Sequence, residues 1–280
     1  MVRGPYTPRE KINEILSWCL EKVNSVPYRP TLRWIFYRAS QQFGLPKKDY
    51  HKFMTWTIDA RKGFKGGWTP ETLADDTRQI HALQLHDAPK DWYESFLDAQ
   101  CNLDPWFKQP RVVMICFEAH AMLGQFRSYA PPYVPLVPFG GEATIDLKSK
   151  ISTVIRNFDE KYSIPITVLY YGDYDPKGLT IPDNAFKDVR EWSGIDFEVI
   201  RLGLSLKQTQ EWGIPDNPER PGQYQWEALD DDRAQALIKA AYSYLNCDEL
   251  RKNIEAEKVA QELFREHLRD FISDTEEETT

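Results

Sequence analysis

The spacing of apolar residues divides the chain into a helical first part and a second part in which strands alternate with helices. After Thr7, apolar residues recur every three or four positions as far as Val23. This spacing predicts an amphipathic helix, and it returns over residues 31–43 and 48–62, where a glycine-rich stretch follows. Three short helices and a glycine-rich turn are typical of helix-turn-helix and winged-helix units, which bind DNA.

Continuous apolar runs bounded by turn residues predict strands in the second part of the chain. The strands are expected over residues 111–117, 133–139, 166–171 and 197–202. Helical spacing predicts longer helices over residues 119–129, 144–160, 183–193, 232–246 and 248–272. Linking helices are expected over residues 79–86 and 90–101. The alternation of strands and helices predicts an α/β fold with a mostly parallel sheet and helices on both faces.

Four parts are expected along the chain. Residues 1–85 form a winged-helix-like DNA-binding domain, and residues 86–110 form a helical linker. Residues 111–212 form the domain with the parallel sheet. A proline- and glycine-rich stretch then leads into a C-terminal helical extension, residues 213–280.

The strand predicted over residues 166–171 ends in the sequence Gly-Asp-Tyr-Asp-Pro-Lys-Gly. Ligands of open α/β sheets bind at the carboxyl ends of the strands, where Asp173 and Asp175 follow this strand and Glu118 follows the first one. Carboxylates that converge at one edge of a sheet can hold Mg²⁺. Glu118, Asp173 and Asp175 are therefore candidate metal ligands. The alternative is a solvated turn, which is the commoner origin of an isolated Asp-x-Asp.

A tyrosine occupies the polar side of the second predicted helix. Tyr37 lies about 140° from Leu32, which belongs to the apolar face, and Arg33 precedes it by one turn. A guanidinium favours phenolate over phenol and can also hold a phosphate. Tyr37 is therefore a candidate nucleophile, with Arg33 as its catalytic partner. The alternative is that Tyr37 packs against another domain. Trp34, on the same side of the helix, could pack in the same way.

Charge is distributed unevenly along the chain. The net charge is −8, yet residues 1–68 contain 13 Lys and Arg against 5 Asp and Glu. A basic first quarter on an acidic body predicts an N-terminal module that binds a polyanion such as DNA. A merely solvated basic face is the alternative. The candidate DNA contacts are Arg38, Lys52, Arg61, Lys62 and Arg78.

The composition, with 41% hydrophobic and 28% charged residues, is that of an ordinary soluble globular protein. The longest apolar run, residues 112–117, is too short to span a membrane, and the first residues lack the apolar core of a secretory signal. The four cysteines have no paired spacing, so neither a zinc site nor a disulfide framework is indicated. We expect a cytoplasmic protein with no membrane partner.

Glu118 after the first strand and Asp-x-Asp after a later parallel strand resemble the signature of the Toprim domain of topoisomerases, primases and certain nucleases. The Asp-Pro-x-Gly that begins at Asp175 resembles the DNA-cleaving chain of topoisomerase VI and its meiotic double-strand-break relatives. Residues 31–37 (Thr-Leu-Arg-Trp-Ile-Phe-Tyr) are similar to the motif that carries the nucleophilic tyrosine of this family. The similarity to small stand-alone phage and prophage relatives is closer still, through residues 74–78 and 225–230.

The resemblance implies a Mg²⁺-dependent enzyme that cleaves DNA in the manner of a type IIB topoisomerase. Tyr37 would attack phosphorus, and Glu118, Asp173 and Asp175 would hold Mg²⁺, or Glu118 would act instead as general acid. The expected partners are duplex DNA and a second copy of the chain, because in this family the tyrosine of one protomer meets the Toprim site of the other. A further partner would be an ATPase subunit that this chain does not encode.

Two other functions stay open at this stage. One is a hydrolytic Toprim nuclease that uses metal-activated water, in which Tyr37 is structural. The other is a non-catalytic DNA-binding module with a degenerate metal site. The sequence does not distinguish DNA from RNA as the substrate.

Overall fold

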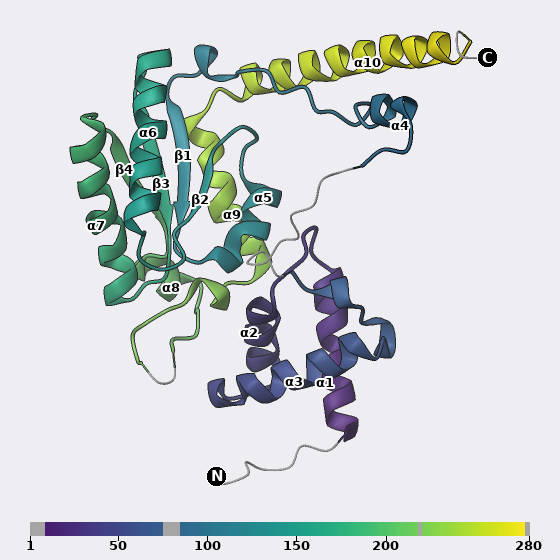
Figure 1. The fold of residues 1–280 in the computed structure, drawn as a ribbon. Coiled ribbons are helices and arrows are strands. Elements are labelled where there is room, and N and C mark those ends of the chain that lie inside the picture. The colour runs from purple at the N-terminus through teal and green to yellow at the C-terminus, as the bar shows by residue number, and fades with distance from the viewer. Residues whose placement is uncertain (1–8, 75–84, 218–219, 278–280) are drawn as a thin grey trace.

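A four-stranded sheet forms the centre of the second part of the chain (Figure 1). The computed structural model describes residues 9–74, 85–217 and 220–277. The strands of the sheet are all parallel, in the order β2-β1-β3-β4. They are β1 (Val112–Phe117), β2 (Leu136–Pro138), β3 (Ile166–Tyr171) and β4 (Glu198–Gly203). The predicted α/β class with a parallel sheet is confirmed.

The two central strands, β1 and β3, are buried along their whole length. Each is a continuous apolar run because helices cover both faces of the sheet. Cys116 pairs with Tyr170, and Phe117 with Tyr171, so the two strands end at the same level. The strand expected over residues 133–139 is reduced to three residues, because the prolines in this stretch cannot donate to the ladder.

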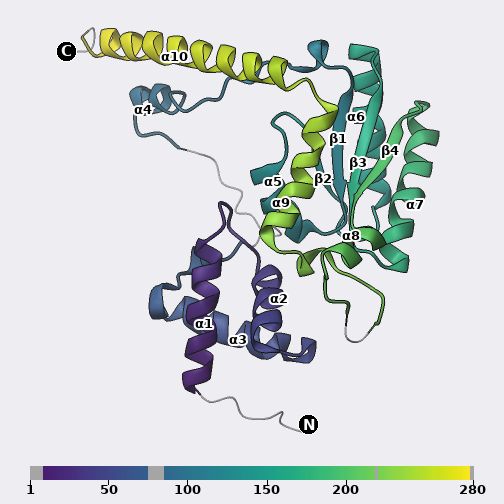
Figure 2. The ribbon, with the colours of Figure 1, turned by 180° about the vertical axis from the view of Figure 1, so that it is seen from behind.

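Helices cover both faces of the sheet, as the alternation of elements predicted (Figures 1 and 2). On one face, α6 (Ile145–Tyr162) packs against α7 (Pro176–Ser193). On the other face, α5 (Leu123–Tyr129) packs against α9 (Asp231–Lys239). The helices of these two layers do not cover the carboxyl ends of the strands. The loops that follow the strands therefore lie next to the N-terminal helices (Figure 1).

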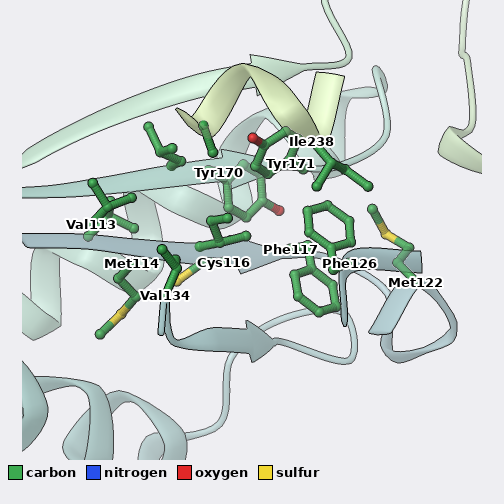
Figure 3. Packing of buried hydrophobic residues seen from close by; sticks show 14 of the residues in the cluster. Val113, Met114, Cys116, Phe117, Met122, Phe126, Val134, Tyr170, Tyr171 and Ile238 are labelled. Carbon is green, nitrogen blue, oxygen red and sulfur yellow. The ribbon is translucent and has the colours of Figure 1, made fainter. Parts of the chain in front are cut away.

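Aromatic side chains fill the space between the sheet and α5 (Figure 3). Phe117 and Phe126 stack with ring centroids 4.3 Å apart and planes 8° apart. Tyr171 meets Phe126 edge-on at 5.0 Å, and Trp226 lies 5.7 Å from the same ring. Buried rings of this size remove a large apolar area from water. Their packing holds the turn that contains Trp226 against the carboxyl end of β3.

Helix α7 begins at Pro176 rather than at residue 183, where the sequence placed its start. Proline is favoured in the first turn of a helix, where its missing amide costs nothing. Pro182 lies inside the helix, and its lack of an amide leaves the carbonyl of Gly178 without its usual partner. Nη1 of Arg201 donates to this carbonyl at 2.9 Å. The hydrogen bond from Arg201 on β4 therefore stabilises a helix that an internal proline would otherwise interrupt.

The N-terminal part consists of α1 (Arg9–Asn24), α2 (Leu32–Phe43) and α3 (Tyr50–Lys62). The three predicted helices are confirmed, and the described residues 9–74 contain no β hairpin of the kind that forms a wing. These helices share a core of their own, separate from that of the sheet. Its most buried members include Ile15, Cys19, Ile35, Phe36, Phe53 and Trp68.

The remaining helices are α4 (Pro89–Glu94), α8 (Leu206–Glu211) and α10 (Cys247–Glu277). Helix α4 is shorter than expected, and it packs on the far end of α10 through Tyr93 and Phe271, whose rings lie 5.2 Å apart. The helix expected over residues 232–246 is divided into α9 and a 3₁₀ turn. Residues 79–84 of the other expected linking helix lie outside the described part. No described helix is both long and apolar enough to cross a membrane.

Short 3₁₀ helices connect these elements. They are Lys47–Asp49, Lys65–Gly67, Pro70–Thr72, Trp106–Lys108, His120–Met122, Trp226–Ala228 and Ala240–Tyr244.

Candidate functional site

Glu118, Asp173 and Asp175 lie at the carboxyl ends of the two central strands. Glu118 follows β1, the two aspartates follow β3, and the two strands are paired along their length. The amide of Asp173 donates to Oε2 of Glu118 at 3.1 Å. The structure thus brings together carboxylates that are separated by more than fifty residues in the sequence.

Each of these carboxylates holds a backbone amide through one oxygen. Oδ1 of Asp173 accepts from the amide of Trp226 at 2.8 Å. Oδ1 of Asp175 accepts from the amide of Gly178 at 2.6 Å and so caps α7. With the bond to Glu118, all three side chains are fixed in orientation. Among the described residues, the second oxygen of each carboxylate accepts no hydrogen bond.

Arg201 on β4 fastens the loop that carries the aspartates. Its Nη2 donates to the carbonyls of Gly172 at 3.1 Å and Asp173 at 2.6 Å. Its Nη1 donates to Gly178 and its Nε to Leu204, at 2.9 and 3.0 Å. One guanidinium therefore satisfies four backbone carbonyls around the site, a use that fits its planar set of donors.

Glu227 is a fourth carboxylate at this site. The residue is only 4% exposed, and neither of its carboxylate oxygens accepts a hydrogen bond. Its Oε1 lies 3.3 Å from Nε of Arg33, within ion-pair distance but without hydrogen-bond geometry. The preceding residue, Trp226, binds Asp173 through its amide. A buried carboxylate destabilises the protein unless a positive charge pairs with it. The charge of Arg33 therefore stabilises the buried carboxylate of Glu227.

The crowding of carboxylates changes their acidity. Burial raises the pKa of Asp173 well above its ordinary value, and the charges of Glu227 and Glu118 raise it further. Burial also raises the pKa of Glu118, and the charges of Asp175 and Glu227 act in the same direction. Desolvation and like charges both disfavour ionised carboxyls. The site is therefore electrostatically suited to a cation.

Tyr37 lies on the side of α2 that faces this acidic group. The guanidinium carbon of Arg33 lies 5.8 Å from the centroid of its ring. The charge of Arg33 lowers the pKa of Tyr37, as the sequence suggested, but burial raises it by more, and Glu227 adds to the increase. The expectation that Arg33 favours a phenolate is thus outweighed by desolvation. At neutral pH the side chain is a phenol.

Two cavities adjoin Tyr37. The first, of 590 Å³, is basic: Arg33, Lys47, Lys48 and His51 line it together with aromatic rings. The second, of 460 Å³, has largely apolar walls and lies between the end of α2 and residues 215–217, 225 and 228. A basic cavity lined by a tyrosine attracts an anion such as a phosphate.

The candidate DNA contacts differ in their surroundings. Arg38 is partly buried with its guanidinium 5.1 Å from the ring of Trp34, and burial lowers its pKa. Lys52 pairs with Asp49 at 3.0 Å, and Arg61 donates to the carbonyl of Pro70. Lys62 is exposed at the end of α3, and Arg78 lies outside the described residues. Trp34 itself is buried and packs edge-on against Tyr28.

Sequence reasoning did not single out several residues of this site. Glu227, Arg201, Lys47, Lys48 and His51 carry no motif of their own. The only signal for Glu227 was the resemblance of residues 225–230 to phage relatives. For the basic cavity, the adjacent Lys47 and Lys48 before the third helix were the available signal.

The oxygen donors of the site suit a hard divalent cation. Its carboxylates have oxygens without hydrogen-bond partners, and those of Glu227 are buried. In the described part of the chain, no three His, Cys, Asp or Glu side chains are gathered as a ready ligand set. Glu118, Asp173 and Asp175, each already held by a backbone amide, are the residues that a bound Mg²⁺ would have to draw together.

The close packing around Gly178 gives a first testable prediction. A Cβ at this position would lie 2.4 Å from the carbonyl oxygen of Asp173 and 2.9 Å from Oε2 of Glu118. Gly178→Ala should therefore displace the aspartate loop and destabilise the protein by about 1–3 kcal/mol, measured by thermal or urea unfolding. Gly124→Ala is the matched control, because its Cβ would meet nothing closer than 3.5 Å. Equal stability of the two variants would contradict the tight packing described.

Comparison with models of protein families, with curated proteins and with solved structures finds no match to this chain. The functional argument therefore depends on the geometry of the site itself.

Proposed function

We propose that the protein is a Mg²⁺-dependent DNA-cleaving enzyme that forms a covalent bond through Tyr37. One observation carries the proposal: a tyrosine beside a basic cavity lies next to Arg33, whose guanidinium reaches a group of carboxylates at the carboxyl edge of a parallel sheet. Basic, nucleophilic and acidic groups in this order match what phosphodiester cleavage by a tyrosine requires. The resemblance to the DNA-cleaving chain of topoisomerase VI, with its Toprim domain, supports the same proposal.

The basic cavity binds the scissile phosphate. Arg33, Lys47 and Lys48 line this cavity beside Tyr37 and supply its positive charge. These contacts are to the backbone of the nucleic acid and carry no sequence preference. Lys62, exposed at the opposite end of α3, is a further positive charge of this part of the chain, which has an excess of Lys and Arg in residues 1–68.

In the chemical step, Oη of Tyr37 forms a bond to phosphorus, and the bond from phosphorus to one sugar oxygen breaks. Tyr37 releases its phenolic proton to water and the departing sugar oxygen gains one, so no proton is consumed overall. Where Asp173 and Asp175 alone hold the cation, Glu118 is instead the proposed general acid for the departing oxygen, a role that the direction of its pKa shift on burial favours. Arg33 favours the developing phenolate. When bound, a divalent cation would neutralise charge on the phosphate.

Cleavage of supercoiled plasmid with Mg²⁺, followed by detergent trapping of protein on the cut ends, tests this proposal. Wild type should leave protein attached to DNA, and Tyr37→Phe and Asp175→Ala should each lose cleavage by at least about 1,000-fold. Tyr162→Phe is the control, because this hydroxyl bonds to Asp104 far from the site. Full cleavage by Tyr37→Phe would exclude the covalent step.

A hydrolytic nuclease is the second candidate, favoured by the raised pKa of Tyr37. In that case only Asp175→Ala loses cleavage, and no protein stays on the DNA. Absence of cleavage by any form of the chain would favour a DNA-binding module or the need for a further subunit.

The proposed partners are duplex DNA, a second copy of the chain and, for strand passage, an ATPase subunit. The cytoplasm is the proposed location.

A further inference from the structure

The last helix, α10, packs on its own chain with one side and leaves an apolar side exposed. On the packed side, Nε2 of Gln261 donates to the carbonyl of Ala99 at 2.8 Å. Nε of Arg265 donates to the carbonyl of Leu97, also at 2.8 Å. The exposed side has the three- and four-residue spacing of a helix face that is normally buried. We call its residues the α10 stripe: Ala256, Val259, Ala260, Leu263, Phe264 and Phe271.

The large side chains of the α10 stripe are in contact with water. Exposed fractions between 46% and 51% are found for Val259, Leu263, Phe264 and Phe271. In both views of the fold, α10 extends away from the sheet, with α4 near its far end (Figures 1 and 2). Single exposed apolar residues are normal, but a continuous row of them marks an interaction surface.

Helix α4 extends this apolar surface. The ring of Phe271 lies 5.2 Å from that of Tyr93. The ring of Trp92 lies 5.4 Å from Tyr93 and 5.2 Å from Phe96, and both Trp92 and Phe96 are exposed. The stripe and these rings expose roughly 500 Å² per copy, because a large side chain has an area of about 150–250 Å². With the charged residues around it, this surface approaches the ~800 Å² that each partner buries in a standard interface.

The shape of the α10 stripe is complementary to itself when two copies of the helix run antiparallel. In such a pair, with a two-fold axis at position 262, residues equally far from this position lie opposite each other. Ala260 then faces Phe264 of the second copy, and symmetry repeats the contact. Leu263, next to the axis, packs against its own copy. A small side chain thus faces a large one, as close packing requires.

The charges beside the α10 stripe are also complementary in this arrangement. Glu255 and Arg269 are equally far from position 262, as are Lys258 and Glu266, and all four are exposed. In the antiparallel pair each acid faces a base of the second copy, whereas in a parallel pair each would face its own kind. Glu262, at the axis, faces its own copy and weakens the pairing. Complementary charges at the rim of an interface fix its register and its partner.

We propose that the α10 stripe and the exposed rings of α4 form a two-fold interface with a second copy of this chain, in which the two α10 helices are antiparallel. The inference goes beyond the proposed function, which calls for a second copy but gives it no surface. Its supports are residues of α10 and α4, and none of them belongs to the candidate site.

The molar mass in solution, measured by light scattering over about a 100-fold range of concentration, tests the interface. Wild type should have twice the mass of the chain. Val259→Glu combined with Leu263→Glu should raise the Kd of the dimer at least about 30-fold, because the new carboxylates would be buried without partners. Val154→Glu is the matched control, since this valine is exposed within α6 and its change should leave the mass unaltered. A monomeric wild type, or a dimer that the double variant leaves intact, would overturn the proposal.

Reversal of two charges tests the antiparallel orientation. Glu255→Arg alone and Arg269→Glu alone should each raise the Kd of the dimer about threefold or more. Both changes together should return it to within about twofold of wild type. The two positions lie about 21 Å apart along one helix, so they cannot interact within one chain. Losses that simply add in the combined variant would rule out this pairing.

Plasmid cleavage by the same proteins separates this inference from the proposed function. A dimeric wild type that does not cleave would remove the function and leave the interface in place. A monomeric wild type that cleaves would remove the interface and leave the covalent chemistry. Loss of cleavage together with the dimer, in the variant with Val259→Glu and Leu263→Glu, would show that this interface brings together the two copies that cut DNA.

Discussion

Arg201→Ala is expected to lower the free energy of unfolding by about 3–5 kcal/mol, because hydrogen bonds to a charged donor are worth more than neutral ones. The guanidinium bonds to four carbonyls around the site, among them Asp173 and Gly178. The carbonyl of Gly178 has no substitute partner, since Pro182 offers no amide. Cleavage should fall by at least about 100-fold, as the aspartate loop loses its position. Urea unfolding and plasmid cleavage measure the two effects.

Two further variants make this prediction specific. Arg201→Lys should recover little, because one ammonium cannot reach carbonyls on several sides of a planar fork. Arg156→Ala is the matched control: its guanidinium donates to the carbonyl of Trp192 at 2.6 Å but is exposed, so its loss should cost under about 1 kcal/mol. Comparable losses of unfolding free energy for Arg156→Ala and Arg201→Ala would show that the four hydrogen bonds of Arg201 stabilise the protein no more than one exposed bond.

Asp173→Asn should stabilise the protein at neutral pH while it abolishes cleavage. The asparagine keeps an oxygen for the amide of Trp226 but removes a buried charge that lies close to Glu227 and Glu118. We expect a gain of about 1–2 kcal/mol, in the range of known stabilising substitutions. Thermal unfolding in the presence of a chelator measures it, so that no bound cation contributes.

The pH dependence of this gain follows from the direction of the pKa shift. The carboxyl of Asp173 has a raised pKa in the folded protein, so its stabilising contribution is complete below its ordinary value of 3.8 and is lost as the pH rises through the folded pKa. The difference between variant and wild type should therefore be largest near neutral pH and shrink toward pH 3.8. Added Mg²⁺ should stabilise wild type more than Asp173→Asn. A variant less stable than wild type at pH 7 would contradict the crowding of charge.

The main architecture was predictable because it depends on local patterns. The apolar runs of β1 and β3 follow from burial on both faces, and the carboxylates that end these strands must meet because parallel strands end at one edge. This reasoning placed Glu118 and Asp173 together without any structure. The bounds of α7 were not predictable, because the carbonyl freed by its internal proline is satisfied by a residue on another strand.

The residues of the site that could not be predicted from the sequence share one physical cause. Glu227 and Arg201 depend on long-range contacts, and nothing in their neighbouring residues shows that one is buried and the other bonds to four carbonyls. The same limit applies to Tyr37. Helical spacing placed it on the polar side of α2, but its acidity depends on how much water the rest of the chain excludes.

Because Asp175 caps α7, the backbone amide of Gly178 should report whether a cation is bound at the site. The amide proton of Gly178 is directed at Oδ1 of a carboxylate that would also face a cation. A cation that withdraws electron density from this carboxylate weakens the bond to the amide, and the glycine resonance moves in a region of the nitrogen–proton spectrum with few other signals. Occupancy of the site can therefore be followed by nuclear magnetic resonance on the resting protein, without substrate or turnover.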